Sequence, residues 1–136
     1  MASFNKFNSF VEALAEKAHN LGSDQLAVAL TNSAPVATNT QLSDITEISY
    51  TNLSSRNITT SSSAQSSGTY KLVLTDLTLT ASGGSVGPFR YVVIYNDTAT
   101  NDELIGWYDY GSSITLAADE TLTIDFDGTN GVLQLA

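Results

Sequence analysis

Apolar positions in residues 1–22 recur with helical spacing, whereas those in the rest of the chain alternate as in strands. Ser9 and Glu12 have the spacing of a capping box, although a helix start nearer Ser3 also fits, and Gly22 suits the C-terminal stop. The residues of the predicted apolar face are Phe7, Phe10, Val11, Leu14, Ala18 and Leu21. The pattern therefore predicts one N-terminal helix.

Residues 25–69 predict strands interrupted by polar loops. Residues 25–32 alternate, with Leu26, Val28 and Leu30 on one face, so they read as a strand. Residues 42–48 are short enough for one helical turn, with Ser43 as its N-cap. Residues 50–69 are dominated by Ser, Thr and Asn, which favours a polar edge strand followed by a turn at 66–68.

The remaining chain continues the strand pattern. Residues 69–82 change phase near Thr75 and Asp76, which indicates a tight turn or a β-bulge there. Residues 121–126 alternate again, and a turn at 127–131 precedes a last short strand. We therefore predict a mainly β fold, a β-sandwich or jelly roll with an N-terminal α-helix. It forms a single domain, 1–136, with a helix or arm at 1–22 and the sandwich at 25–136.

Residues 86–111 are the densest apolar and aromatic part of the chain. Between Phe89 and Tyr95 only Arg90 is polar, so both faces of this strand need cover. We predict an antiparallel hairpin in which Tyr95 faces Leu104. This register pairs Val93 with Gly106, Tyr91 with Tyr108, Phe89 with Tyr110, and Arg90 with Asp109. One face then holds Phe89, Tyr91, Tyr95, Tyr108 and Tyr110, and the other Val92, Ile94, Ile105 and Trp107.

The aromatic residues are the candidate interface residues, and two interpretations stay open. Large apolar side chains usually pack in the chain's own core, so the N-terminal phenylalanines are expected to lie over the tyrosine face. Tyrosine and phenylalanine also anchor protein interfaces, and Phe4 begins what could be an arm that packs on a neighbour. The candidates are Phe4, Phe7, Phe10, Tyr91, Tyr108 and Tyr110.

Charge and composition exclude several partners. The formal net charge is −9, and no base follows Arg90, so the surface repels nucleic acid. There is no apolar run long enough to cross a membrane and no signal-peptide core, so we expect no membrane partner and a protein that stays in the cytosol where it is made. The chain has no cysteine, which excludes disulfides and thiolate metal sites.

The chemistry of an enzyme is not visible in the sequence. His19 is the only histidine, and we interpret it as a surface residue near a helix end. Residues 125–131 resemble the start of a calcium loop, but the glycine falls one place late, so a hairpin turn explains them better. Carboxylate pairs lie in predicted loops. We predict no catalytic residue, no cofactor, no metal and no enzymatic activity.

The order of these elements is similar to a known group of proteins. It includes "LAVALTNSAPVATNT", "SGTYKLVLTDLTLTASGGSVGPFRYVVIYND" and "LIGWYDYGSSITLAADETLTIDFD". In this order the chain resembles the small jelly-roll cement, or decoration, proteins of tailed bacteriophage capsids. It also resembles small β-rich tail and fibre modules. The likeness covers nearly the whole chain but carries no functional residue that transfers by position.

The resemblance implies a structural protein made in the host bacterial cytoplasm and placed on the outer surface of the virion. Its partners would be the major capsid protein and itself, as a dimer or trimer. The alternative is a fibre-type module that recognises a cell-surface glycan or protein through Tyr91, Tyr108 and Tyr110, with loop residues such as Asn96 and Asn101.

Overall fold

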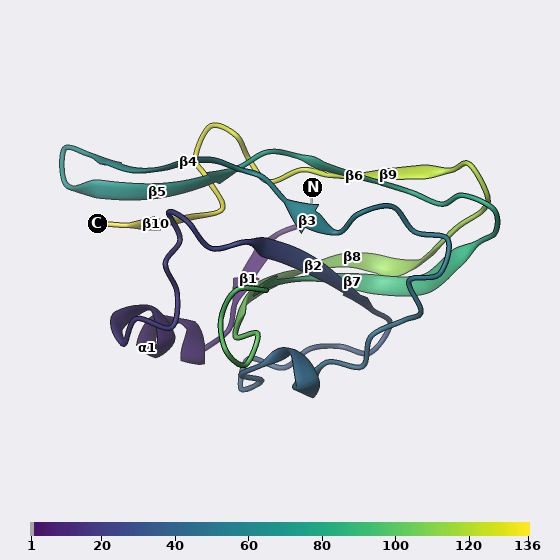
Figure 1. Ribbon diagram of the computed structural model, residues 1–136, viewed down its shortest axis with the longest axis horizontal. Coiled ribbons are helices and arrows are strands. Elements are labelled where there is room, and N and C mark those ends of the chain that lie inside the picture. Colours follow the sequence, from purple (N-terminus) through teal and green to yellow (C-terminus); the bar gives the residue numbers. More distant parts are fainter. Residues whose placement is uncertain (1) are drawn as a thin grey trace.

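The computed structural model describes residues 2–136 and is mainly β, which confirms the predicted fold class (Figure 1). One layer is a five-stranded sheet in the order β1 (Phe4–Lys6), β8 (Leu104–Leu116), β7 (Val86–Asn96), β2 (Leu26–Thr31) and β3 (Asn57–Ile58). The facing layer holds two smaller sheets. They are β10 (Leu133–Leu135), β5 (Thr69–Leu74) and β4 (Thr60–Ser66), and β6 (Leu77–Thr80) with β9 (Thr121–Ile124). This arrangement is consistent with a β-sandwich, while the jelly-roll topology stays a prediction.

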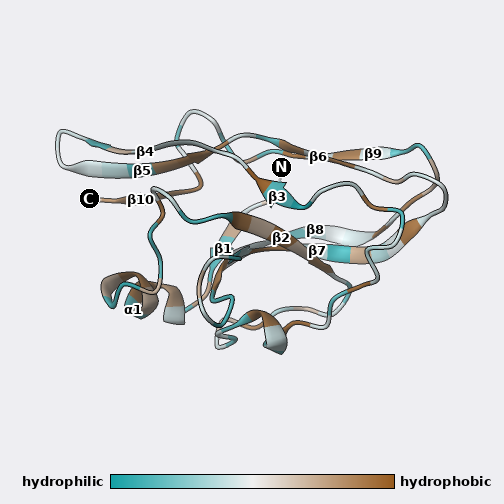
Figure 2. Cartoon of the chain, in the orientation of Figure 1, coloured by the Kyte–Doolittle hydropathy of each residue, from teal (hydrophilic) through white to brown (hydrophobic). Residues whose placement is uncertain are grey.

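The five-stranded sheet is covered on both faces, which explains the unbroken apolar run of residues 89–95. Its inner face meets the smaller sheets in the main core, where Leu30, Val92 and Ile94 are buried with Leu72, Leu79, Ile124 and Phe126. The outer face carries a second apolar cluster of Phe7, Ala27, Ala29, Ile45, Val93, Tyr95 and Leu104. All six residues of β2 are buried, and most of β2 is brown in Figure 2. Successive side chains of β2 therefore point alternately into the main core and into the outer cluster.

The N-terminal segment differs from the predicted long helix. Helix α1 spans only Ser9–Ala15, its N-cap is Asn8, and Lys17 has a positive φ of 72°. Phe4 lies before the helix in β1, where it is paired with Tyr108 of β8. An extended segment gains ladder hydrogen bonds along the edge of β8, which a helical start at Ser3 would forgo. Ala18 and Leu21, which fit the predicted helical spacing, therefore lie in the segment between α1 and β2 and not in a helix.

The register of the central hairpin also differs from the prediction. Tyr95 does face Leu104, but Ile94 faces Gly106 and Val93 faces Trp107, so Ile105 is an extra residue on β8. A bulge of one residue exchanges the faces of every side chain beyond it. Tyr108 therefore joins Val92 and Ile94 in the main core, while Trp107 moves to the opposite face beside Val93 and Tyr95. The predicted tyrosine face is therefore divided, because Phe89, Tyr108 and Tyr110 belong to the main core while Tyr95 belongs to the outer cluster.

Several local predictions are confirmed. The phase change at Thr75 and Asp76 is the point where the chain leaves β5 for β6 in another sheet. The turn at 66–68 joins β4 to β5, and β4 is an edge strand. The helical turn in 42–48 is a 3-10 helix at Leu42–Asp44, although its N-cap is Gln41 rather than Ser43. The turn at 127–131 is held by the Asp127 carboxylate, which accepts from the backbone N–H groups of Thr129 and Asn130.

Candidate functional site

The six candidate aromatic residues lie on both faces of the five-stranded sheet. Phe7 is fully buried in the outer cluster, with its ring centroid 4.6 Å from that of Trp107. Phe10 is buried in the main core, and Tyr91 is buried between Thr31 and Asp109 of the neighbouring strands. These three side chains therefore stabilise the chain itself and offer no free surface.

The structure brings the other three candidates together. The ring of Phe4 packs edge-on against Tyr108 with a centroid distance of 5.6 Å, and Tyr110 is half-buried in the same core region. Tyr108 also lies 6.2 Å from the ring of Phe126. Tyr108 and Tyr110 line a surface hollow of about 490 Å³, which also involves Ala2, Asp109, Gly111, Thr123 and Asp125. We call it the tyrosine hollow.

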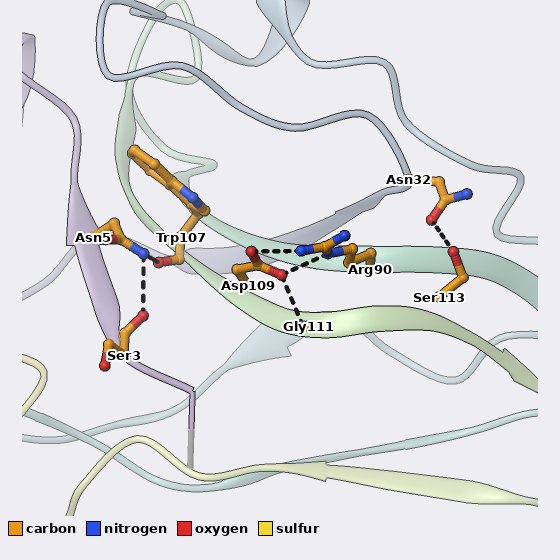
Figure 3. A network of polar contacts seen from close by, with 8 residues as sticks. All are labelled: Ser3, Asn5, Asn32, Arg90, Trp107, Asp109, Gly111 and Ser113. Carbon is orange, nitrogen blue, oxygen red and sulfur yellow. Dashed lines mark hydrogen bonds and ion pairs between the residues drawn. The ribbon is translucent and has the colours of Figure 1, made fainter.

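Two carboxylates, Asp109 and Asp125, line the tyrosine hollow, and they are not equally available. Asp109 is held by Arg90 of β7 through two contacts, Nε to Oδ1 at 2.8 Å and Nη2 to Oδ2 at 3.1 Å, and also accepts from the Gly111 N–H (Figure 3). The Arg90 guanidinium, followed by the Gly111 N–H, lowers the pKa of Asp109. Asp125 makes no ion pair within residues 2–136. Burial, then Asp125, raises the pKa of Tyr110. Asp125 is thus the carboxylate of the hollow without an ion pair among the described residues, and its Oδ1 accepts one hydrogen bond, from the Asp127 N–H at 2.9 Å.

A second depression lies between α1 and the sheet β10–β5–β4. It has a volume of about 530 Å³ and is mainly apolar, because Leu14, Leu21, Tyr70 and Leu135 are among its walls. The Tyr70 hydroxyl and the Ser63 hydroxyl are hydrogen bonded to each other at 2.7 Å. Leu135, at the open side, is 46 % exposed, a high value for a leucine. We call this depression the α1 groove.

His19 contributes to the wall of the α1 groove and is buried, so its predicted surface position was wrong. Asn96 accepts from the Thr98 and Ala99 N–H groups through Oδ1, which directs its Nδ2 to Asp24 Oδ2 at 2.7 Å and to His19 Nδ1 at 3.0 Å. An amide nitrogen only donates, so His19 Nδ1 accepts and the ring is neutral. Burial lowers the pKa of His19, against the opposing effect of Glu103 and Asp24.

This polar network was invisible in the sequence because its members are far apart in the chain. His19 and Asn96 are separated by 77 residues, and neither stands in a motif. Asn96, one of the two loop residues of the glycan-recognition alternative, is fully buried at the end of β7, whereas Asn101 is exposed. His19 Nε2 and Glu103 Oε2 are both buried without a hydrogen-bond partner among the described residues. The network links the turn after α1 to the end of β7.

Residues 2–136 contain no group of three or more His, Asp or Glu side chains placed to bind a metal ion. Within the same residues, no helix is both long enough and apolar enough to span a membrane. The chain matches no family model, and no curated protein or solved structure is significantly similar to it. The site must therefore be judged from its own geometry, and its two candidates are the tyrosine hollow, which is aromatic and acidic, and the α1 groove, which is mainly apolar.

Proposed function

We propose that this protein is a non-enzymatic structural component of a tailed-phage virion that binds the outside of the capsid and cements neighbouring major capsid subunits. The resemblance of the sequence to decoration proteins suggests the capsid surface as the place where the protein acts. The observation that carries the proposal is the α1 groove, because an apolar recess with an exposed leucine at its mouth suits attachment to another protein.

The α1 groove would hold an apolar side chain from a capsid subunit. Burying one leucine-sized side chain contributes about 1.5–3 kcal/mol, which is weak for a single contact. An oligomer that engages several capsid subunits at once multiplies such weak contacts into stable attachment. A cement protein can therefore attach stably through several weak contacts, so a shallow groove on each small subunit is sufficient for capsid binding.

The surface charge fits an external position. The formal net charge of −9 disfavours contact with packaged nucleic acid, since such contact depends on Lys and Arg. The α1 groove is lined by one basic residue, Lys17, and no acidic one. A capsid surface patch of apolar and acidic character would therefore meet the groove without repulsion.

The test is co-sedimentation of the purified protein with undecorated heads of its phage. The Leu135→Asp variant places a charge at the mouth of the α1 groove, and we expect it to lose at least tenfold in affinity. Val36→Asp is the matched control, because Val36 is 53 % exposed and does not line the groove. Unchanged binding of Leu135→Asp would exclude the groove, and absence of saturable binding by the unaltered protein would exclude cement.

Recognition of a cell-surface glycan is the second candidate, and the tyrosine hollow favours it. Aromatic faces pack against sugar rings, carboxylates accept hydrogen bonds from sugar hydroxyls, and side-chain hydroxyls both accept and donate them. The hollow offers Tyr110, Asp125 and Thr123. Whole host cells form the parallel arm of the sedimentation experiment. Binding to cells that is lost in Tyr110→Ala, with no binding to heads, would replace the cement proposal with this one.

A further inference from the structure

Strand β4 is an exposed edge strand with little of the usual protection. It spans Thr60–Ser66, pairs only with β5 among residues 2–136, and contains neither a charged residue nor a proline. Five of its seven residues are exposed. Natural sheets usually protect such edges with lysine, proline, a bulge or a covering loop, because a free edge is a template for another strand. The one bulge lies between Thr60 and Ser62, which leaves Ser62–Ser66 in regular register.

The direction of the free hydrogen-bonding groups follows from the β4–β5 hairpin. Ser66 faces Thr69 across a two-residue turn in which Ser67 and Gly68 both have positive φ. In such a hairpin the closing pair is hydrogen bonded, and bonded pairs then recur at every second residue. Ser62, Ala64 and Ser66 therefore bond to β5. The backbone N–H and C=O groups of Ser63 and Gln65 point away from it.

The charge distribution shows which partner this edge can accept. All fourteen acidic residues lie outside residues 48–75, and the bases within that range are Arg56 and Lys71. Arg56 lies 3.9 Å from Glu47, so its charge is partly compensated. Two copies that each carry a net charge of −9 repel one another over most of their surfaces. Neither β4 nor its neighbour β5 contains an acidic residue, so pairing through β4 places no carboxylate within the joined strands.

We propose that two copies of this chain associate by antiparallel pairing of β4 with β4, with the two-fold axis at Ala64. Ala64 is the centre of the regular segment, and this register places Ser63 opposite Gln65 of the partner subunit. Each such pair exchanges two backbone hydrogen bonds, and the smaller sheets of the two copies join into one continuous sheet. The small exposed side chains of Ser62, Ala64 and Ser66 leave the approach open.

The dimer gives a physical basis for the self-association expected of a cement protein, and in that sense it rests on the proposed function. Its test needs only the isolated protein, so failure of the dimer and failure of capsid binding are separate results. Light scattering coupled to size exclusion over a range of concentrations is expected to show a dimer. A monomer at every concentration would overturn the inference.

Lysines introduced into β4 test whether this edge is the dimer interface. In the proposed register Ser62 lies opposite Ser66 of the partner subunit as a non-hydrogen-bonded pair, in which side chains approach most closely. The double variant Ser62→Lys/Ser66→Lys is expected to be monomeric. Thr100→Lys/Asn101→Lys adds the same charge to an exposed loop elsewhere and should still dimerise. A dimer that survives the lysines at β4 would exclude this edge.

Glutamate in place of the lysine at position 62 tests the register of the proposed β4–β4 pair. Ser62→Glu/Ser66→Lys places opposite charges across the same two pairs, so the dimer should return in this variant and weaken as salt screens the attraction. Failure of this variant to dimerise would exclude the register centred on Ala64. Thermal unfolding of each variant at low protein concentration separates loss of the dimer from loss of the fold, because these exposed positions should leave the unfolding of the monomer almost unchanged.

Discussion

The Tyr50 hydroxyl accepts a hydrogen bond from the backbone nitrogen of Leu30 at 3.0 Å and donates to Glu47 Oε1 at 2.6 Å. This contact completes the edge of β2 where β3 has already ended, since β3 pairs only with Leu26 and Ala27. Backbone groups of the 48–56 segment serve the same edge, because Ile48 N donates to Leu30 O and Val28 N donates to Arg56 O. A loop and one phenol thus replace a missing strand.

Tyr50→Phe should destabilise the protein through one lost hydroxyl. Leu30 is fully buried, so its N–H would have no partner, and an unsatisfied buried donor costs about 1–3 kcal/mol. Urea unfolding measures the loss. Tyr70→Phe is the matched control, because the Tyr70 hydroxyl meets only the Ser63 hydroxyl at the surface of the α1 groove. An equal loss in both variants would contradict the role of Tyr50 as a strand partner.

Phe10→Ala should be among the most damaging single changes. The Phe10 ring is buried in the main core and lies 5.3 Å from the His19 ring, so its removal leaves a cavity and costs about 3–5 kcal/mol. Val11 follows it on the exposed side of α1, and Val11→Ala should change the free energy of unfolding by less than about 0.5 kcal/mol. A mild effect of Phe10→Ala would indicate that the N-terminal segment is not docked in solution.

Gly106→Ala should displace β1 from β8. A Cβ atom at this position would lie 2.6 Å from the backbone oxygen of Asn5 and would overlap the Phe4 ring, and the backbone has no room to yield without breaking the pairing. We expect a clear fall in thermal midpoint and faster hydrogen exchange at residues 4–6. Gly128→Ala has open space around its Cβ and should leave the midpoint nearly unchanged.

Burial of His19 should make stability depend on pH in a range where no carboxylate normally titrates. The folded state lowers the pKa of His19 below its ordinary value of 6.5, so the unfolded chain binds the proton more readily. The stability that follows from burying neutral His19 is therefore fully present above pH 6.5, and it is lost as the pH falls below that value. Asp24 and Glu103 oppose the shift without reversing its sign.

The His19→Gln variant checks this assignment because it keeps a polar side chain and removes the titrating ring. Denaturant unfolding of both proteins between pH 7 and pH 5 should show a decline in the unaltered protein that is smaller in the variant. Hydrogen bonds lower the pKa values of Asp44 and Asp109, so these carboxyls affect stability only at lower pH. Their effect is the same in the unaltered protein and in the variant. Parallel pH profiles would contradict the neutral, buried state of His19.

The sequence by itself determined the features that depend on neighbouring residues. Alternation in residues 25–32 identified β2, and the turn formers at 66–68 and 127–131 marked the hairpin and the last turn, because strand periodicity and positive φ are local properties. The pairing of Arg90 with Asp109 was also anticipated, although the residue directly opposite Asp109 is Tyr91.

Only the tertiary structure decided the features that depend on distant partners. The extra residue Ile105 moved Trp107 and Tyr108 to opposite faces, and the sequence did not reveal this bulge because both faces of the hairpin are largely apolar or aromatic there. Phe4 became a strand residue because the edge of β8 was free, and His19 was buried because Asn96 and Phe10 enclose it. The candidate surfaces likewise arise where segments remote in sequence meet.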